Sequence, residues 1–146
     1  MATSEPRLLK ATTAGDAAVE GLVHGIIAGV AMAAYLVVAG LLGGDSPATM
    51  LGRFGLGSEA SPIAGVLGHL AVSGVYGIIW GLIWRSVHRK SGVPGSLAGI
   101  AYGLVLFLGS QVLLPAAGSP LAAVPAVHLA VAHVIYGLVL GLWSGR

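Results

Sequence analysis

Apolar residues dominate four long windows of the chain, and none of these windows contains Asp, Glu, Lys or Arg. The windows are residues 21–42, 63–84, 95–114 and 121–143. Each has 20 to 23 residues, so a helix over it is roughly 30–35 Å long and matches the hydrocarbon core of a bilayer. All charged residues lie between or outside the windows. The pattern predicts an all-α, polytopic membrane protein with four transmembrane helices.

The breaks between the windows carry helix-start signals. Ser61 and Ser119 each place a capping hydroxyl directly before a proline, and proline is favoured at the first position of a helix. Pro125 falls about one turn into the fourth window, where we expect it to be tolerated with a slight kink. These signals predict helices that start close to the window boundaries.

Composition supports a membrane protein. The chain is 56% apolar and only 8% charged, whereas about 25% of the residues of a soluble domain are charged. The net charge of +2 gives no reason to expect nucleic-acid binding, and the absence of cysteine excludes disulfides and thiolate sites. We expect residues 1–20 to form a cytoplasmic tail and residues 21–146 to form one membrane domain, with the lipid bilayer as its surroundings.

The basic residues are distributed unevenly between the two predicted sides of the membrane. One side carries Arg7, Lys10, Arg85, Arg89, Lys90 and Arg146, and the other carries Arg53 alone. Basic residues accumulate on the cytoplasmic side of membrane proteins, so both termini are predicted to be cytoplasmic. Trp80, Trp84 and Trp143 would then act as interfacial anchors near the cytoplasmic ends of the second and fourth spans.

The two halves of the chain resemble each other. Residues 69–84 read HLAVSGVYGIIWGLIW, and residues 128–143 read HLAVAHVIYGLVLGLW. The first and third spans match at Gly21/Gly95, Gly25/Gly99 and Gly29/Gly103. We therefore predict two tandem helical hairpins that are parallel repeats, related by an axis along the membrane normal. In this alignment His69 and His128 are equivalent.

The glycines suggest how the helices pack. Helices associate in lipid through close backbone approach and polar contacts, so small residues in helical spacing mark helix interfaces. The predicted packing positions are Gly25, Gly29, Gly99, Gly103, His133, Gly137 and Gly141. We expect a tightly packed bundle with little internal volume. The same positions could bind helices of partner subunits or of a homo-oligomer.

The histidines are the candidates for chemistry. Two neutral imidazoles at equivalent positions could ligate haem b, so His69 and His128 are candidate haem ligands. The alternative is that each buried histidine bonds a neighbouring helix and fixes the packing. His24 is expected to contact Glu20, and Gln111 is expected to bond between helices together with Ser110. No metal site is predicted.

Other features of the sequence argue against catalysis. The spans contain no charged residue, which argues against a proton-driven transporter or an ion pump. There is no phosphate loop, zinc-protease motif or evident nucleophile–base pair. We therefore expect the protein not to be an enzyme and to need no cofactor unless the haem alternative holds.

The segments HVIYGLVLGLW (residues 133–143) and VYGIIWGLIW (residues 75–84) resemble those of small, uncharacterised bacterial four-span membrane proteins. So does the Gly-x3-Gly pattern of the first span. The resemblance covers the four spans and implies a bacterial inner membrane protein, but it transfers no catalytic residue. The preferred function is that of an accessory or scaffold protein acting through helix–helix contacts. The alternatives are a haem protein for electron transfer or sensing and, third, a facilitator for a small neutral solute.

Overall fold

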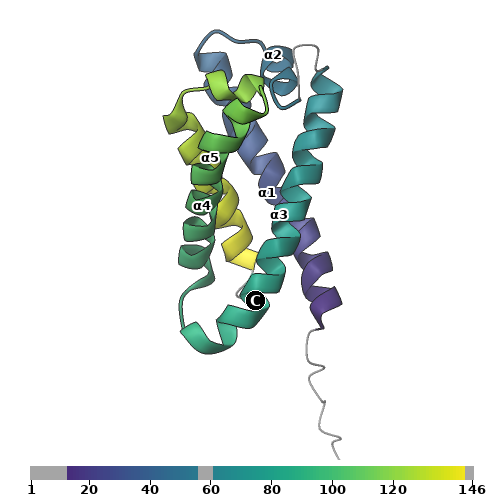
Figure 1. The fold of residues 1–146 in the computed structure, drawn as a ribbon, viewed down its shortest axis with the longest axis vertical. Helices are drawn as coiled ribbons and strands as arrows, with labels where there is room; N and C mark the ends of the chain where they lie inside the picture. Colours follow the sequence, from purple (N-terminus) through teal and green to yellow (C-terminus); the bar gives the residue numbers. More distant parts are fainter. Residues whose placement is uncertain (1–12, 56–60, 144–146) are drawn as a thin grey trace, which may run out of the picture.

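The computed structural model describes residues 13–55 and 61–143, and this part of the chain is helical (Figure 1). Its elements are α1 (Ala14–Leu42), α2 (Pro47–Gly52), α3 (Pro62–Ser91), α4 (Gly95–Ala116), the 3₁₀ helix η1 (Pro120–Ala123) and α5 (Ala126–Trp143). The helices α1, α3, α4 and α5 are long and apolar enough to cross a membrane. The prediction of an all-α protein with four candidate spans is confirmed.

Helix α1 begins before the first apolar window because its start is capped. The Thr13 hydroxyl accepts a hydrogen bond from the Asp16 amide, and the Asp16 carboxylate accepts one from the Thr13 amide. This reciprocal pair satisfies amides that the first helical turn leaves without partners. Residues 14–20, predicted to belong to the tail, are therefore helical. The rest of the predicted tail, residues 1–12, lies outside the described residues.

Helix α3 continues past its apolar window to Ser91. Residues 85–91 lie between the second and third apolar windows, and no helix-stopping residue occurs among them. The helix ends at Gly92, whose φ of 59° is in the left-handed region that favours glycine. Only Gly92, Val93 and Pro94 then separate α3 from α4, and this short connection reverses the chain direction.

The start of the fourth helix differs from the prediction. Ser119 and Pro120 open the 3₁₀ helix η1 rather than the spanning helix, and α5 begins at Ala126. Pro125 therefore precedes the helix instead of lying inside it. The residue before a proline is driven toward extended conformations, and Val124 adopts one with φ −73° and ψ 133°. This extended residue separates η1 from α5.

The connection between the first two spans contains the short helix α2, which the apolar pattern did not predict. Ser46 caps it, and its buried Met50 packs against Gly40 of α1. Arg53 forms a two-pronged ion pair with Asp45, with N–O distances of 2.7 and 2.9 Å. These contacts hold α2 across the end of the bundle where α1 ends and α3 begins (Figure 1).

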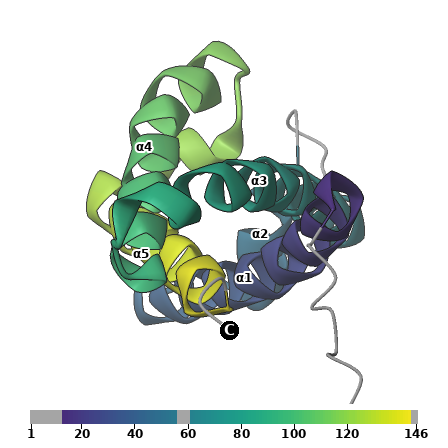
Figure 2. The same ribbon diagram turned by 90° about the horizontal axis from the view of Figure 1, so that it is seen from below.

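The four long helices pack unequally. Helix α1 lies along α3, α4 lies along α5, and α1 also contacts α5. Viewed along the bundle, α4 lies outside the group formed by α1, α3 and α5 (Figure 2). Large side chains fill the space between the halves, among them Trp80, Trp84 and Tyr136. Close packing thus holds within each hairpin, while an aromatic layer joins the halves. Because Trp80 and Trp84 are buried, the prediction that they are interfacial anchors is wrong.

Candidate functional site

Helices α1 and α3 meet along a seam of small residues. A Cβ atom on Gly25 would collide with the backbone of Ser73 and Gly77, and one on Gly29 would collide with the Ser73 side chain. The seam continues to Gly21, which lies against the Gly77 carbonyl. The two backbones therefore touch directly, as expected of small-residue interfaces in membranes.

Helices α4 and α5 meet along a second seam of the same kind. A Cβ on Gly99 would meet Gly137 and Gly141, and one on Gly103 would meet the His133 carbonyl. All seven residues predicted as packing positions thus lie in one or the other seam. His133 takes part through its backbone, since its carbonyl faces Gly103.

The two seams repeat the same contacts in the same order. Gly21 lies against the Gly77 carbonyl in the first seam, and Gly95 lies against the Gly141 carbonyl in the second. Eight residues before Gly77 is His69, and eight residues before Gly141 is His133. The contacts therefore make His133 the counterpart of His69, although sequence similarity matched His69 with His128. Backbone contact between glycines sets the register here. The duplication of the hairpin itself stays a prediction.

His69 projects from α3 toward α1 and α2. Its Nε2 atom donates a hydrogen bond of 3.0 Å to the carbonyl of Gly29, which is one of the glycines of the first seam. Its ring stacks on Phe54, which follows α2, with centroids 4.6 Å apart. His69 thus ties three elements of the first half together.

His128 lies at the interface between the two halves. Its Nδ1 atom is hydrogen-bonded to the Tyr35 hydroxyl of α1 at 3.0 Å. His128 and His69 therefore bond different groups within the bundle. Haem ligation through Nε2 would require His69 to give up its bond to Gly29, so the structure adds no support for this pair, and the haem alternative stays a prediction.

The other histidines of the spans also have defined environments. His133 donates from Nδ1 to the Leu129 carbonyl of its own helix at 2.7 Å, and its ring lies edge-on to Phe107. His24 stacks on Trp143 with centroids 5.2 Å apart, which differs from the expected contact with Glu20. His88 falls in α3, but its side chain lies outside the described part. Among the described residues, no cluster of three or more His, Cys, Asp or Glu could hold a metal.

Two tyrosines of the second half bond the backbone of α3. The Tyr136 hydroxyl donates to the Ser73 carbonyl at 2.6 Å, and the Tyr102 hydroxyl donates to the Tyr76 carbonyl at 2.8 Å. Together with the Tyr35–His128 bond, they form three polar links across the aromatic layer. The carbonyls that accept these bonds belong to the backbone of another helix, so they carry no sequence signal.

Ser110 and Gln111 do not bond between helices as predicted. The Ser110 hydroxyl donates to the Phe107 carbonyl of the same helix, and the Gln111 amide donates to Ser110 at 3.3 Å. Gln111 is exposed at the side of α4. Within the described residues its amide therefore makes no hydrogen bond to another helix.

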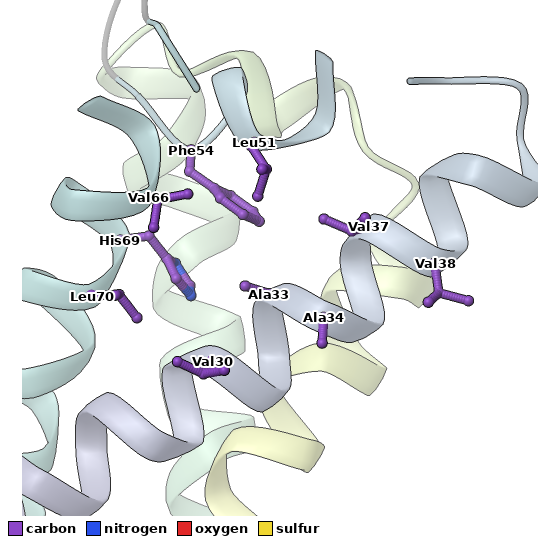
Figure 3. A pocket seen from close by; sticks show the side chains of 10 residues that line it. All are labelled: Val30, Ala33, Ala34, Val37, Val38, Leu51, Phe54, Val66, His69 and Leu70. Atoms are coloured by element: carbon purple, nitrogen blue, oxygen red, sulfur yellow. The ribbon is translucent and has the colours of Figure 1, made fainter. Parts of the chain in front are cut away.

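An apolar groove lies between α1 and α3 beneath α2 (Figure 3). We call it the His69 groove, and its volume is about 420 Å³. Aliphatic side chains and Phe54 line it, and His69 is the one residue of its lining with a polar side chain. The sequence could not predict this groove, because it depends on the placement of α2.

Four apolar membrane-length helices, arranged as two glycine-seamed hairpins, define a small helical membrane protein. The chain belongs to DUF6789, a family of unknown function, whose model matches residues 15–146. No curated protein and no solved structure matches the chain.

Proposed function

We propose that this protein is a non-enzymatic component of a membrane assembly and that α4 is the helix through which it contacts its partner. We place it in a bacterial inner membrane, as its resemblance to small bacterial four-span proteins implies. The basic-residue distribution supports an orientation with both termini cytoplasmic. The observation that carries the proposal is the peripheral position of α4, which leaves most of its surface uncovered.

The uncovered surface forms a continuous face. In α4 only Gly99 and Gly103 are buried. Val105, Leu108 and Val112 are 64%, 65% and 70% exposed, and their spacing of three and four residues places them on one side of the helix. We call this surface the α4 face. Its apolar character suits either lipid or another helix.

Gln111 indicates that the α4 face packs against another helix rather than against lipid. It adjoins Leu108 and Val112 on the α4 face, and its amide makes no bond to another helix within the described residues. A polar side chain near the end of a membrane span is stabilised by hydrogen bonds across a helix–helix interface. An amide both donates and accepts, so Gln111 is complementary to itself. The partner we expect is therefore a second copy of this chain.

Site-specific photo-crosslinking in native membranes tests this proposal. A photoreactive phenylalanine at Leu108 should give an adduct of twice the chain mass, and Gln111→Leu should reduce its yield. The matched control is the same probe at Val75, which is 54% exposed on α3. An adduct of another mass at Leu108 would show that the partner is a different protein and not a second copy of this chain. Equal adducts at both positions, or no protein adduct at Leu108, would contradict the proposal.

A further inference from the structure

The His69 groove combines an apolar lining with one polar group. Its volume of about 420 Å³ falls within the range of small-molecule sites, about 300–1,000 Å³. Its walls come from three elements: Val30 and Ala34 from α1, Val66 from α3, and Leu51 from the α2 side. Figure 3 shows that these side chains and the His69 ring border one space. A molecule in this space would contact hydrocarbon on every side except at the imidazole.

The hydrogen bond to Gly29 fixes what the imidazole can do. A carbonyl oxygen only accepts hydrogen bonds, so Nε2 of His69 carries the proton. In a neutral imidazole the other nitrogen, Nδ1, is then an acceptor. No group of the described residues donates to it, and every fully buried side-chain nitrogen or oxygen among them has a partner. Nδ1 is therefore an acceptor to which the described residues offer no donor, and it lies beside an apolar space.

The groove is reached from the side of the bundle. Val30 and Val38, which border it, are 53% and 54% exposed. Both belong to the apolar window of α1, so lipid surrounds them when the helix spans a bilayer. Phe54 and Leu51 close the groove at the end covered by α2. A ligand would thus enter from the hydrocarbon phase.

From these observations we propose that the His69 groove binds a lipid-soluble molecule that carries a hydroxyl group, with the hydroxyl donating to Nδ1 of His69. The apolar body fills the space between α1 and α3. A molecule whose only polar group is an ether or a ketone lacks the donor, so it fills the space without satisfying Nδ1. This inference does not depend on the α4 face.

The ligand chemistry can be tested with pairs of closely related probes, of which one member carries a hydroxyl donor and the other does not. Proteoliposomes are labelled with a photoreactive long-chain alcohol, and competition is measured with hexadecanol and with hexadecyl methyl ether. A second pair is decylhydroquinone and decylquinone, which distinguishes a phenolic ring from a simple chain alcohol. Adducts are located by peptide mass spectrometry. We expect labels on the groove-lining segments and competition about fivefold stronger for each hydroxylated member, because one hydrogen bond is lost in its partner.

Two variants separate the site from the fold. His69→Phe removes the acceptor and should abolish the preference for the hydroxylated probe. The His69→Phe substitution also removes the hydrogen bond to Gly29. A second variant, Ala34→Phe, therefore fills the groove while keeping His69. The matched control is His128→Phe, which alters a histidine outside the groove, and circular dichroism verifies folding.

Equal competition within both probe pairs would overturn the proposal. So would groove labelling unchanged in folded Ala34→Phe, or adducts located elsewhere. A preference for decylhydroquinone without one for hexadecanol would identify the ligand as phenolic, and the reverse result would identify it as an aliphatic alcohol.

Discussion

The seam glycines show how a single missing side chain determines helix contact. At Gly137 a Cβ atom would collide with the Gly99 carbonyl, whereas one at Gly109 would meet nothing within 4 Å. Both glycines lie in transmembrane helices and look alike in the sequence. Their surroundings, and not their residue type, decide the cost of substitution.

Gly137→Leu should destabilise the protein by at least about 2 kcal/mol, because the larger side chain forces α4 and α5 apart. The measurement is unfolding in mixed detergent micelles followed by circular dichroism. Gly109→Leu is the control and should leave the unfolding midpoint nearly unchanged. A similar loss in both variants would show that helix propensity or insertion, and not seam contact, governs the effect.

The sequence predicted which glycines lie at helix interfaces. Gly25 and Gly29, like Gly99 and Gly103, are four residues apart, and this spacing can be read directly from the sequence. It did not predict the bonding of the histidines. His69 and His128 share the same local sequence, HLAV, yet one bonds a carbonyl and the other a tyrosine. The partners come from other helices, so no local pattern reports them.

At the scale of elements, hydropathy located all four long helices but not all of their ends. Local chemistry set the differences: a capping box at Thr13, the absence of a stop signal before Gly92, and Pro125 with its extended neighbour. Helix α2 is too short for its apolar pattern to be distinctive. Its position depends on one buried methionine and one ion pair.

Arg53→Met should loosen α2, because the substitution removes both N–O contacts with Asp45 but keeps an apolar stem. A partly exposed ion pair contributes about 1 kcal/mol at most, so the amides of α2 should exchange with solvent deuterium up to about fivefold faster. The measurement is hydrogen exchange followed by mass spectrometry. Exchange in α4 serves as the internal control, and unchanged exchange in α2 would show that Met50 alone anchors it.

For the molecule as a whole, the decisive feature is the difference between contacts within and between hairpins. Within each hairpin backbone meets backbone, and between them large aromatic side chains and three hydrogen bonds fill the space. The tight symmetrical bundle expected from the glycines is therefore found only within the hairpins. The spacing of the glycines showed which helix faces carry small residues. It could not show that α4 would lie outside the other three helices.

Tyr136→Phe should destabilise the junction between the halves by about 1 kcal/mol, since it removes one bond to the Ser73 carbonyl and no packing volume. Adding Tyr102→Phe should deepen the loss. Tyr76→Phe is the control, because its backbone carbonyl rather than its hydroxyl takes part in the network. Equal unfolding midpoints for Tyr136→Phe and Tyr76→Phe would contradict a role for these bonds.

The pairing of α1 with both α3 and α5 has a consequence for biogenesis. As the chain leaves the ribosome, α1 gains its first membrane-spanning partner once α3 is inserted, and the first seam can then form. The opposite side of α1 stays uncovered until α5, the last of the four long helices, enters the bilayer. Assembly of the domain is therefore completed only after α5 has been inserted. Until then, the surface of α1 that α5 covers in the complete domain is exposed.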